Sequence, residues 1–199
     1  ERQNLSRAPY LPFDGLNEHG LAVGMMAVSH AEGGSHPARR TLDSLEVIRL
    51  LLDYARTVDD ALALLADYNV NFEGGPPIHY LIADRTGASV VVEYLDGVPV
   101  VLRNEQPWQV STNFILQEEQ PVGANSSCWR YNQAHTTLES TSGALSSDAA
   151  MSLLQSLSQS GDFPTIWSVV YNLTQGDVML VVGREYTQIY SFQTALSAH

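Results

Sequence analysis

The stretch Ile78–Phe114, IHYLIADRTGASVVVEYLDGVPVVLRNEQPWQVSTNF, decides the fold of this chain. β-Branched and aromatic residues dominate four segments of it, which turn residues or a proline separate. The four predicted strands are Ile78–Ala83, Ser89–Tyr94, Val98–Leu102 and Gln109–Phe114. Gly87 and Gly97 suit the tight turns between them, because glycine adopts positive φ without a steric penalty. The pattern predicts a β-meander, and we expect the rest of the chain to pack on it.

Further strands and helices are predicted on both sides of this meander. Leu21–Val28 is apolar at almost every position, which predicts a strand buried on both faces after a polar turn at Asp14–Gly20. Apolar residues at helical spacing predict helices from Thr41 to about Ala55, after a cap at Thr57, over Ser127–Leu138 and over Ser147–Ser158. The remaining predicted elements are a loop at Asn69–Pro77 and strands at Thr165–Leu173, Asp177–Val182 and Thr187–Phe192. Helices grouped outside antiparallel sheets indicate one α+β layered domain over residues 1–199.

Composition excludes several classes of function. The formal net charge is −12, and every one of the 10 basic residues is an arginine. We expect no nucleic-acid partner, because binding a phosphate backbone needs a basic face. Without lysine, these residues supply no P-loop lysine, Ser-Lys dyad or Schiff base. No apolar run approaches the ~18 residues of a membrane span, and the single cysteine, Cys128, leaves the cellular compartment open.

Five phrases of the sequence, in order, resemble one enzyme group. They are DGLNEHGLAVGMMAV (Asp14–Val28), IHYLIADRTGASVVVEY (Ile78–Tyr94), VSTNF (Val110–Phe114), SSCWRY (Ser126–Tyr131) and TIWSVVYNL (Thr165–Leu173). The group is the choloylglycine hydrolases and penicillin acylases among the N-terminal-nucleophile (Ntn) hydrolases. The sequence is most similar to the branch related to acyl-coenzyme A:6-aminopenicillanic acid acyltransferase. The resemblance implies a four-layer αββα sandwich of largely antiparallel sheets.

The resemblance also implies a nucleophile outside these residues. Members of the group begin their mature chain with a catalytic cysteine, and nothing before Asp14 resembles that segment. In such enzymes the α-amino group, with a pKa near ~8, is the base for the thiol of its own residue, so no histidine is required. We therefore expect an N-terminally incomplete fold whose nucleophilic segment lies upstream of Glu1. The chain alone is expected to be inactive, because the Glu1 carboxylate is a poor nucleophile.

The resemblance implies catalytic roles for Asn113 and Arg130. Asn113 matches the asparagine beside the oxyanion, and Arg130 matches the arginine that supports the nucleophile. Non-catalytic alternatives exist for both residues. Asn113 could be a strand-end asparagine bonded to its own backbone, and Arg130 could be a surface arginine on a helix. Ala27 and Thr112 are predicted at the substrate-binding surface. Ala27 has no side-chain donor where bile-salt hydrolases carry asparagine, which argues against bile-salt specificity, and Thr112 is expected to pack against Asn113.

No cofactor or metal site is predicted. His30, Glu32 and His36 form a loop cluster with metal-ligand chemistry, but no second cluster completes the ligand set. We interpret His79 as a structural histidine and Glu93 as a member of a strand-end ion pair. Cys128 is interpreted as a small buried side chain on a helix.

The predicted function is hydrolysis of a linear amide C–N bond in a small-molecule N-acyl amide. An acyltransferase of the same fold would pass the acyl group to an amine instead of water. A catalytically empty homologue would keep the cleft as a binding module. The sequence leaves open the acyl group, the leaving amine, the compartment and whether the protein is a homo-oligomer.

Overall fold

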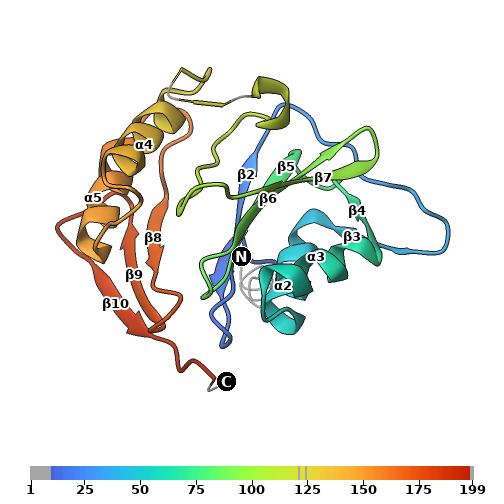
Figure 1. The fold of residues 1–199 in the computed structure, drawn as a ribbon, viewed down its shortest axis with the longest axis horizontal. Coiled ribbons are helices and arrows are strands. Elements are labelled where there is room, and N and C mark those ends of the chain that lie inside the picture. Colours follow the sequence, from blue (N-terminus) through green and yellow to red (C-terminus); the bar gives the residue numbers. More distant parts are fainter. Residues whose placement is uncertain (1–9, 121, 124, 198–199) are drawn as a thin grey trace.

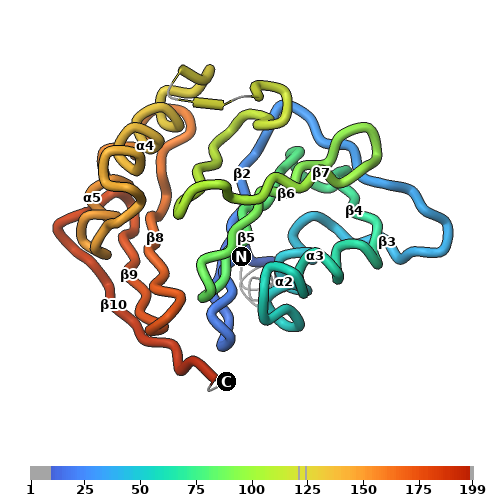
Figure 2. Tube along the Cα trace, in the orientation of Figure 1, coloured from blue at the N-terminus to red at the C-terminus, as the bar shows by residue number. Residues whose placement is uncertain are grey.

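Two β-sheets face each other between two pairs of helices in the computed structural model, which describes residues 10–120, 122–123 and 125–197 (Figures 1 and 2). Helices α2 (Ser44–Tyr54) and α3 (Val58–Ala66) pack on a five-stranded sheet. Helices α4 (Trp129–Ser140) and α5 (Ser147–Leu157) pack on each other, and α5 packs on a three-stranded sheet. This is the predicted four-layer αββα sandwich.

The five-stranded sheet has the order β1-β2-β5-β6-β7, and its pairings are antiparallel. Its strands are β1 (Asp14–Leu16), β2 (Ala22–Ala27), β5 (Ile78–Ala83), β6 (Ser89–Leu95) and β7 (Val98–Arg103). The last three strands correspond to the first three of the four strands predicted for the meander. β2 pairs with both β1 and β5, so it lies inside the sheet as expected.

The two faces of β2 are not equally buried, contrary to the prediction. Val23, on the face under α2, is 1% exposed. Gly24 points to the other face, towards the three-stranded sheet, and no atom lies within 4 Å of the place that a Cβ would occupy. The inner face of the sheet is therefore open at β2.

The segment Gln109–Phe114 was predicted as a strand, and this is wrong. The segment has no regular secondary structure and crosses the inner face of the five-stranded sheet. Hydrogen bonds explain the difference, because the backbone around this segment bonds to buried side chains and not to a neighbouring strand. The carbonyl of Thr112 accepts a hydrogen bond from His79, and the N–H groups of Leu116 and Gln117 donate to Glu93.

Several short elements also differ from the predictions. The expected polar turn begins with strand β1, and the expected loop 69–77 begins inside strand β4 (Tyr68–Asn71), which pairs in parallel with β3 (Arg40–Asp43). Helix α2 starts after Asp43 rather than Thr41, because the Asp43 and Glu46 side chains form a capping box. Helix α4 begins at Trp129, two residues later than predicted.

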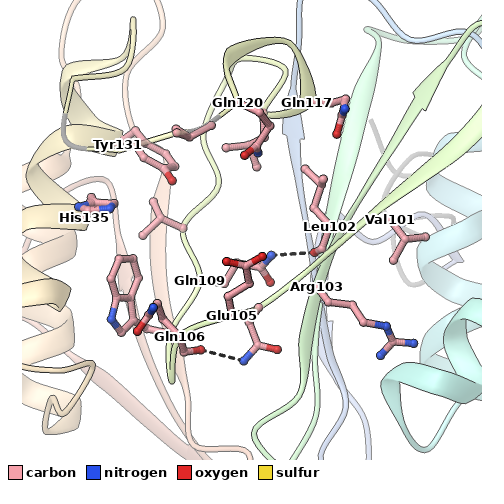
Figure 3. Close-up of a pocket in the computed structure, with 15 residues that line it drawn as sticks. Val101, Leu102, Arg103, Glu105, Gln106, Gln109, Gln117, Gln120, Tyr131 and His135 are labelled. Atoms are coloured by element: carbon pink, nitrogen blue, oxygen red, sulfur yellow. Dashed lines mark hydrogen bonds between the residues drawn. The ribbon is translucent and has the colours of Figure 1, made fainter.

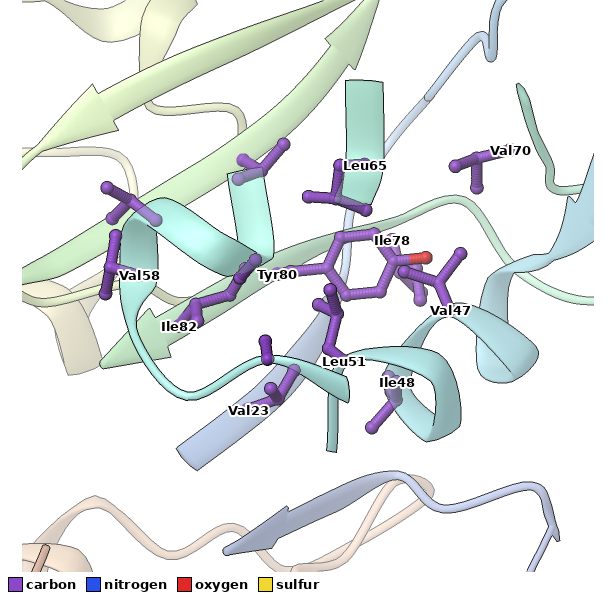
Figure 4. Packing of buried hydrophobic residues seen from close by; sticks show 14 of the residues in the cluster. Val23, Val47, Ile48, Leu51, Val58, Leu65, Val70, Ile78, Tyr80 and Ile82 are labelled. Atoms are coloured by element: carbon purple, nitrogen blue, oxygen red, sulfur yellow. The ribbon is translucent and has the colours of Figure 1, made fainter. Parts of the chain in front are cut away.

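The main hydrophobic core lies between α2, α3 and the five-stranded sheet (Figure 4). Figure 4 shows Leu51 and Val47 of α2 facing the ring of Tyr80 on β5. Each such buried side chain contributes about 1.5–3 kcal/mol relative to exposure. The Tyr80 hydroxyl is satisfied, because it donates to the Ser44 carbonyl at 2.8 Å. The core therefore fixes β5 from its outer face.

The three-stranded sheet has the order β10-β9-β8. Its strands are β8 (Trp167–Tyr171), β9 (Asp177–Val182) and β10 (Tyr190–Gln193). Both β8 and β10 are shorter than predicted. Ser168 and Val181 are buried and belong to one face. The other face is apolar, and Trp167, Leu180 and Phe192 line a cavity of about 440 Å³ on it.

Candidate active site

An irregular segment, residues 111–117, carries the candidate catalytic asparagine across the space between the sheets (Figure 1). Phe114 and Leu116 pack with Val91 of β6 and Tyr131 of α4 in a second, smaller core. The rings of Phe114 and Tyr131 meet edge to face at 5.2 Å between centroids. The segment is thus held against the five-stranded sheet on one side and against helix α4 on the other.

Asn113 is exposed, and its side-chain amide is oriented from both ends. Its Nδ2 donates to the main-chain carbonyl of Ala27 at 2.7 Å. Its Oδ1 accepts from Arg130 Nη2 at 2.6 Å. Because a guanidinium only donates and a carbonyl only accepts, this arrangement sets which end of the amide is the NH₂ group. One of the two Nδ2 hydrogens is left for another acceptor.

Arg130 reaches Asn113 from the first turn of helix α4, and Cys128 is the N-cap residue of that helix. Cys128 is half-buried at this position, not fully buried in a helix as predicted. Burial raises the pKa of its thiol, but the neighbouring Thr112 hydroxyl, the Tyr131 and Arg130 backbone N–H groups and the Arg130 charge outweigh burial and lower the pKa. The Cys128 thiol therefore loses its proton more readily than the thiol of a free cysteine.

Beneath the segment lies a buried ion pair between β5 and β6. His79 Nδ1 lies 2.9 Å from Glu93 Oε1, and the side chains are 1% and 2% exposed. Burial alone raises the pKa of Glu93. Hydrogen bonds from His79, from the Gln117 and Leu116 N–H groups, and the His79 charge outweigh burial, so the pKa is lowered. Glu93 is consequently a carboxylate inside the protein.

The sequence-predicted site residues come together in space. Asn113, Arg130 and Ala27 are linked by the two hydrogen bonds described above, across 86 and 17 positions of sequence. Ala27 contributes its carbonyl rather than its side chain. Thr112 is buried, so its side chain packs in the interior and does not face the site surface. Catalytic and substrate-binding roles for these residues stay predictions.

Sequence reasoning interpreted His79 and Glu93 separately as structural residues and did not pair them. The structure joins them and connects both to the segment that carries Asn113. A signal was present in the sequence. Each is the one acidic or basic residue of its strand, and two such residues on neighbouring strands of a hairpin are candidates for one cross-strand pair.

The cavity in Figure 3, of about 500 Å³, lies between the two halves of the sandwich. Tyr131 and His135 of α4 form one wall, and Leu102 of β7 lies on the other. Gln109 Nε2 donates to the Leu102 carbonyl at 2.8 Å between them. Neither Asn113 nor Arg130 lines this cavity.

The described part of the chain holds no cluster of three or more His, Cys, Asp or Glu residues placed to bind a metal ion. The His30–Glu32–His36 loop therefore supplies no such cluster. Within the same residues, no helix is both long and apolar enough to cross a membrane.

Comparison with known proteins places this geometry in a family. A model of the family "AAT: Acyl-coenzyme A:6-aminopenicillanic acid acyl-transferase" matches residues 12–186. The chain belongs to this family. A curated relative, uncharacterized protein A284L of Paramecium bursaria Chlorella virus 1, is 33% identical over 109 residues, which are 50% of this chain and 38% of that protein.

Solved structures of two enzymes share the fold of this family member. Penicillin V acylase from Agrobacterium tumefaciens superposes with a TM-score of 0.69 at 20% identity, over 88% of this chain and 64% of the acylase. A variant of conjugated bile acid hydrolase from Clostridium perfringens gives 0.71 at 15% identity, over 91% of this chain and 72% of the hydrolase. Both belong to the Ntn-hydrolase group, so the predicted fold and group are confirmed. The chain spans under two thirds of the acylase and of the viral relative.

Proposed function

We propose that the intact protein hydrolyses a linear amide C–N bond. The proposed nucleophile is a cysteine at the N-terminus of the mature protein, upstream of these 199 residues. The observation that carries the proposal is the oriented amide of Asn113. The residue is exposed, its Nδ2 donates to the Ala27 carbonyl and keeps one unassigned hydrogen, and its Oδ1 accepts from Arg130. Such a preorganised donor is what a tetrahedral oxyanion requires.

In the proposed mechanism, the thiol of the upstream cysteine attacks the amide carbonyl while its own α-amino group takes the proton. The negative charge that develops on the carbonyl oxygen accepts a hydrogen bond from Asn113 Nδ2. The α-ammonium then protonates the leaving amine as the C–N bond breaks, which leaves an acyl thioester. Water attacks the thioester and releases the carboxylic acid, and the thiol regains its proton.

Arg130 has two roles in this proposal. Its hydrogen bond to Asn113 Oδ1 keeps the NH₂ group on the side where the oxyanion forms. Its positive charge also favours anionic species nearby, as the lowered pKa of Cys128 illustrates. A single oxyanion-hole donor typically contributes about 10²–10³-fold to kcat.

The upstream segment has a receiving surface in this proposal. The inner face of the three-stranded sheet exposes Trp167 at 39%, Val182 at 50% and Phe192 at 57%. Folded proteins rarely leave a contiguous apolar sheet face uncovered. The open inner face at Gly24 lies on the opposite sheet. We assign this space to the residues that carry the nucleophile, consistent with the greater length of penicillin V acylase.

Acyl transfer is the second candidate, and the family that the chain belongs to is named for it. The same thioester would form, and an amine would attack it in place of water. The two candidates therefore share Asn113 and Arg130 and differ only in the acceptor. Product analysis with and without an added amine separates them.

The test is to express the 199 residues with their upstream coding segment and assay turnover of N-acyl amino acids and penicillin V. Asn113→Ala should lower kcat by about 10²–10³-fold. Asn71→Ala changes an asparagine at the end of strand β4, whose Oδ1 accepts from the Glu73 N–H outside the site, so it is the matched control and should leave kcat unchanged. The chain alone should be inactive. Turnover by the chain alone that survives Cys128→Ala would refute the proposed nucleophile.

A further inference from the structure

His79 and Glu93 form a buried ion pair on the face of β5 and β6 that is turned to the space between the sheets. Their nearest atoms, Nδ1 and Oε1, are 2.9 Å apart, and both side chains are almost inaccessible to solvent. Leaving a charge unpaired in such a place is costly, so the pair has to be satisfied by further hydrogen bonds. The direction of those bonds is informative.

Within the described residues, the other side-chain hydrogen bonds of the pair go to residues 111–117, on both sides of Asn113. His79 Nε2 lies 2.8 Å from the carbonyl oxygen of Thr112 and 3.0 Å from Ser111 Oγ. Glu93 Oε1 accepts from the N–H of Leu116 at 2.7 Å, and Oε2 accepts from the N–H of Gln117 at 3.0 Å. The backbone is therefore anchored immediately before Asn113 and again just after it.

The partners determine the protonation of His79. Nδ1 faces a carboxylate oxygen and Nε2 faces a main-chain carbonyl oxygen, and neither oxygen is a donor. With Glu93 as a carboxylate, both ring nitrogens face acceptors, which is the hydrogen-bond pattern of an imidazolium. Glu93 meets three donors, the imidazolium and two backbone N–H groups, as an ionised carboxylate does.

We propose that His79 and Glu93 are positioning residues, an imidazolium–carboxylate pair that fixes the segment 111–117 so that Asn113 presents its NH₂ group to the oxyanion. The pair is buried beneath the segment and acts through the backbone on either side of Asn113. Its catalytic consequence rests on the proposed function. Its structural consequence, the orientation of Asn113, does not.

Glu93→Gln is the sharpest perturbation, because the glutamine has the same shape. Both carboxylate oxygens of Glu93 accept hydrogen bonds, whereas glutamine has only one oxygen. Its NH₂ group would therefore face a donor that a carboxylate oxygen accepts from in the wild type. Tyr80→Phe is the matched control. This change removes a buried hydrogen bond of strand β5, which is the neighbour of β6. The Tyr80 side chain lies on the opposite face of the sheet, so the change does not affect a contact with the segment 111–117.

The first measurement is made on the 199-residue chain and does not depend on catalytic activity. In two-bond ¹H–¹⁵N spectra of histidine-labelled protein at neutral pH, both His79 nitrogens should show the shifts of an imidazolium. The side-chain amide signal of Asn113, assigned by its loss in Asn113→Ala, should move in Glu93→Gln and stay in Tyr80→Phe. A neutral His79 tautomer in the unsubstituted chain, or an Asn113 signal unmoved in Glu93→Gln, would overturn the proposal. The imidazolium measurement needs no variant to fold.

The second measurement uses the intact enzyme with its nucleophile. Glu93→Gln should lower kcat by about 10–100-fold, the scale of a misplacement near 1 Å, with KM changed much less. Tyr80→Phe should keep kcat. Equal kcat values in the two variants would overturn the positioning role. If Asn113→Ala retains activity, the proposed function fails, and the spectra still decide whether the pair orients Asn113.

Discussion

Asp14 joins the two sheets of the sandwich, and removing its carboxylate should weaken the whole fold. Asp14, on edge strand β1 of the five-stranded sheet, accepts from the Tyr171 hydroxyl and from Trp167 Nε1, both at 2.7 Å. Both donors belong to β8 of the three-stranded sheet. Asp14→Ala therefore breaks two hydrogen bonds between the sheets in one step.

The magnitude follows from the type and exposure of these bonds. A hydrogen bond to a charged group contributes about 1.5–3 kcal/mol, and partial solvent access lowers that value. Trp167 is 39% exposed, whereas Tyr171 is half-buried and its pKa is raised by burial and by the neighbouring Asp14. We expect Asp14→Ala to lower the free energy of unfolding by about 2–4 kcal/mol. Asp14→Asn, with one carbonyl oxygen, should lose about half as much.

The assay is urea unfolding followed by far-UV circular dichroism. Asp162→Ala is the control, because it removes the same charge from an exposed loop residue. Tyr171→Phe should lower the free energy of unfolding by about 1–2 kcal/mol in the wild type and by much less in Asp14→Ala, since the bond is already gone. The reasoning is refuted if Asp14→Ala lies within about 0.5 kcal/mol of Asp162→Ala, the usual range of surface substitutions.

Three further predictions concern the site and the first helix. Arg130→Met should raise the pKa of Cys128 and slow its alkylation at neutral pH by about twofold or more, whereas Arg103→Met should not. Because the folded-state pKa of Glu93 lies below 4.5, its contribution to stability is present above that pH and lost as the pH falls through the lowered value. Unfolding measured from pH 7 to 3 should accordingly show a steeper loss below 4.5 in the wild type than in Glu93→Gln. Asp43→Ala should lower the free energy of unfolding by about 1 kcal/mol through loss of the α2 capping box, as measured by urea unfolding against Asp162→Ala.

Much of the layered fold could be predicted because its signals are local. The turns before Ser89 and Val98 and the β-branched residues between them indicate the meander without knowledge of the rest of the chain. The cap at Thr57 is equally local, since its side chain bonds an N–H three residues away. The parallel pair β3–β4 was missed because each strand has only four residues, too few for a periodic pattern, and their partners lie far apart in sequence.

In the candidate site, too, the residues could be found from the sequence, whereas their contacts could not. Resemblance to a family singled out Asn113 and Arg130 by the phrases around them, but no local pattern shows that one amide is shared between the Ala27 carbonyl and a guanidinium. The wrong strand at 109–114 has the same origin. Its residues suit a β-strand, and the long-range bonds to His79 and Glu93 override that preference.

The sequence by itself determined the helices, most strands, the absence of lysine and the family resemblance, because these depend on residue identity and short-range order. The tertiary structure alone decided which polar groups meet. Asp14 and Tyr171 are 157 positions apart, and His79 and Thr112 are 33 apart. Burial favours a partner for each polar group, and which partner it meets depends on how the layers pack.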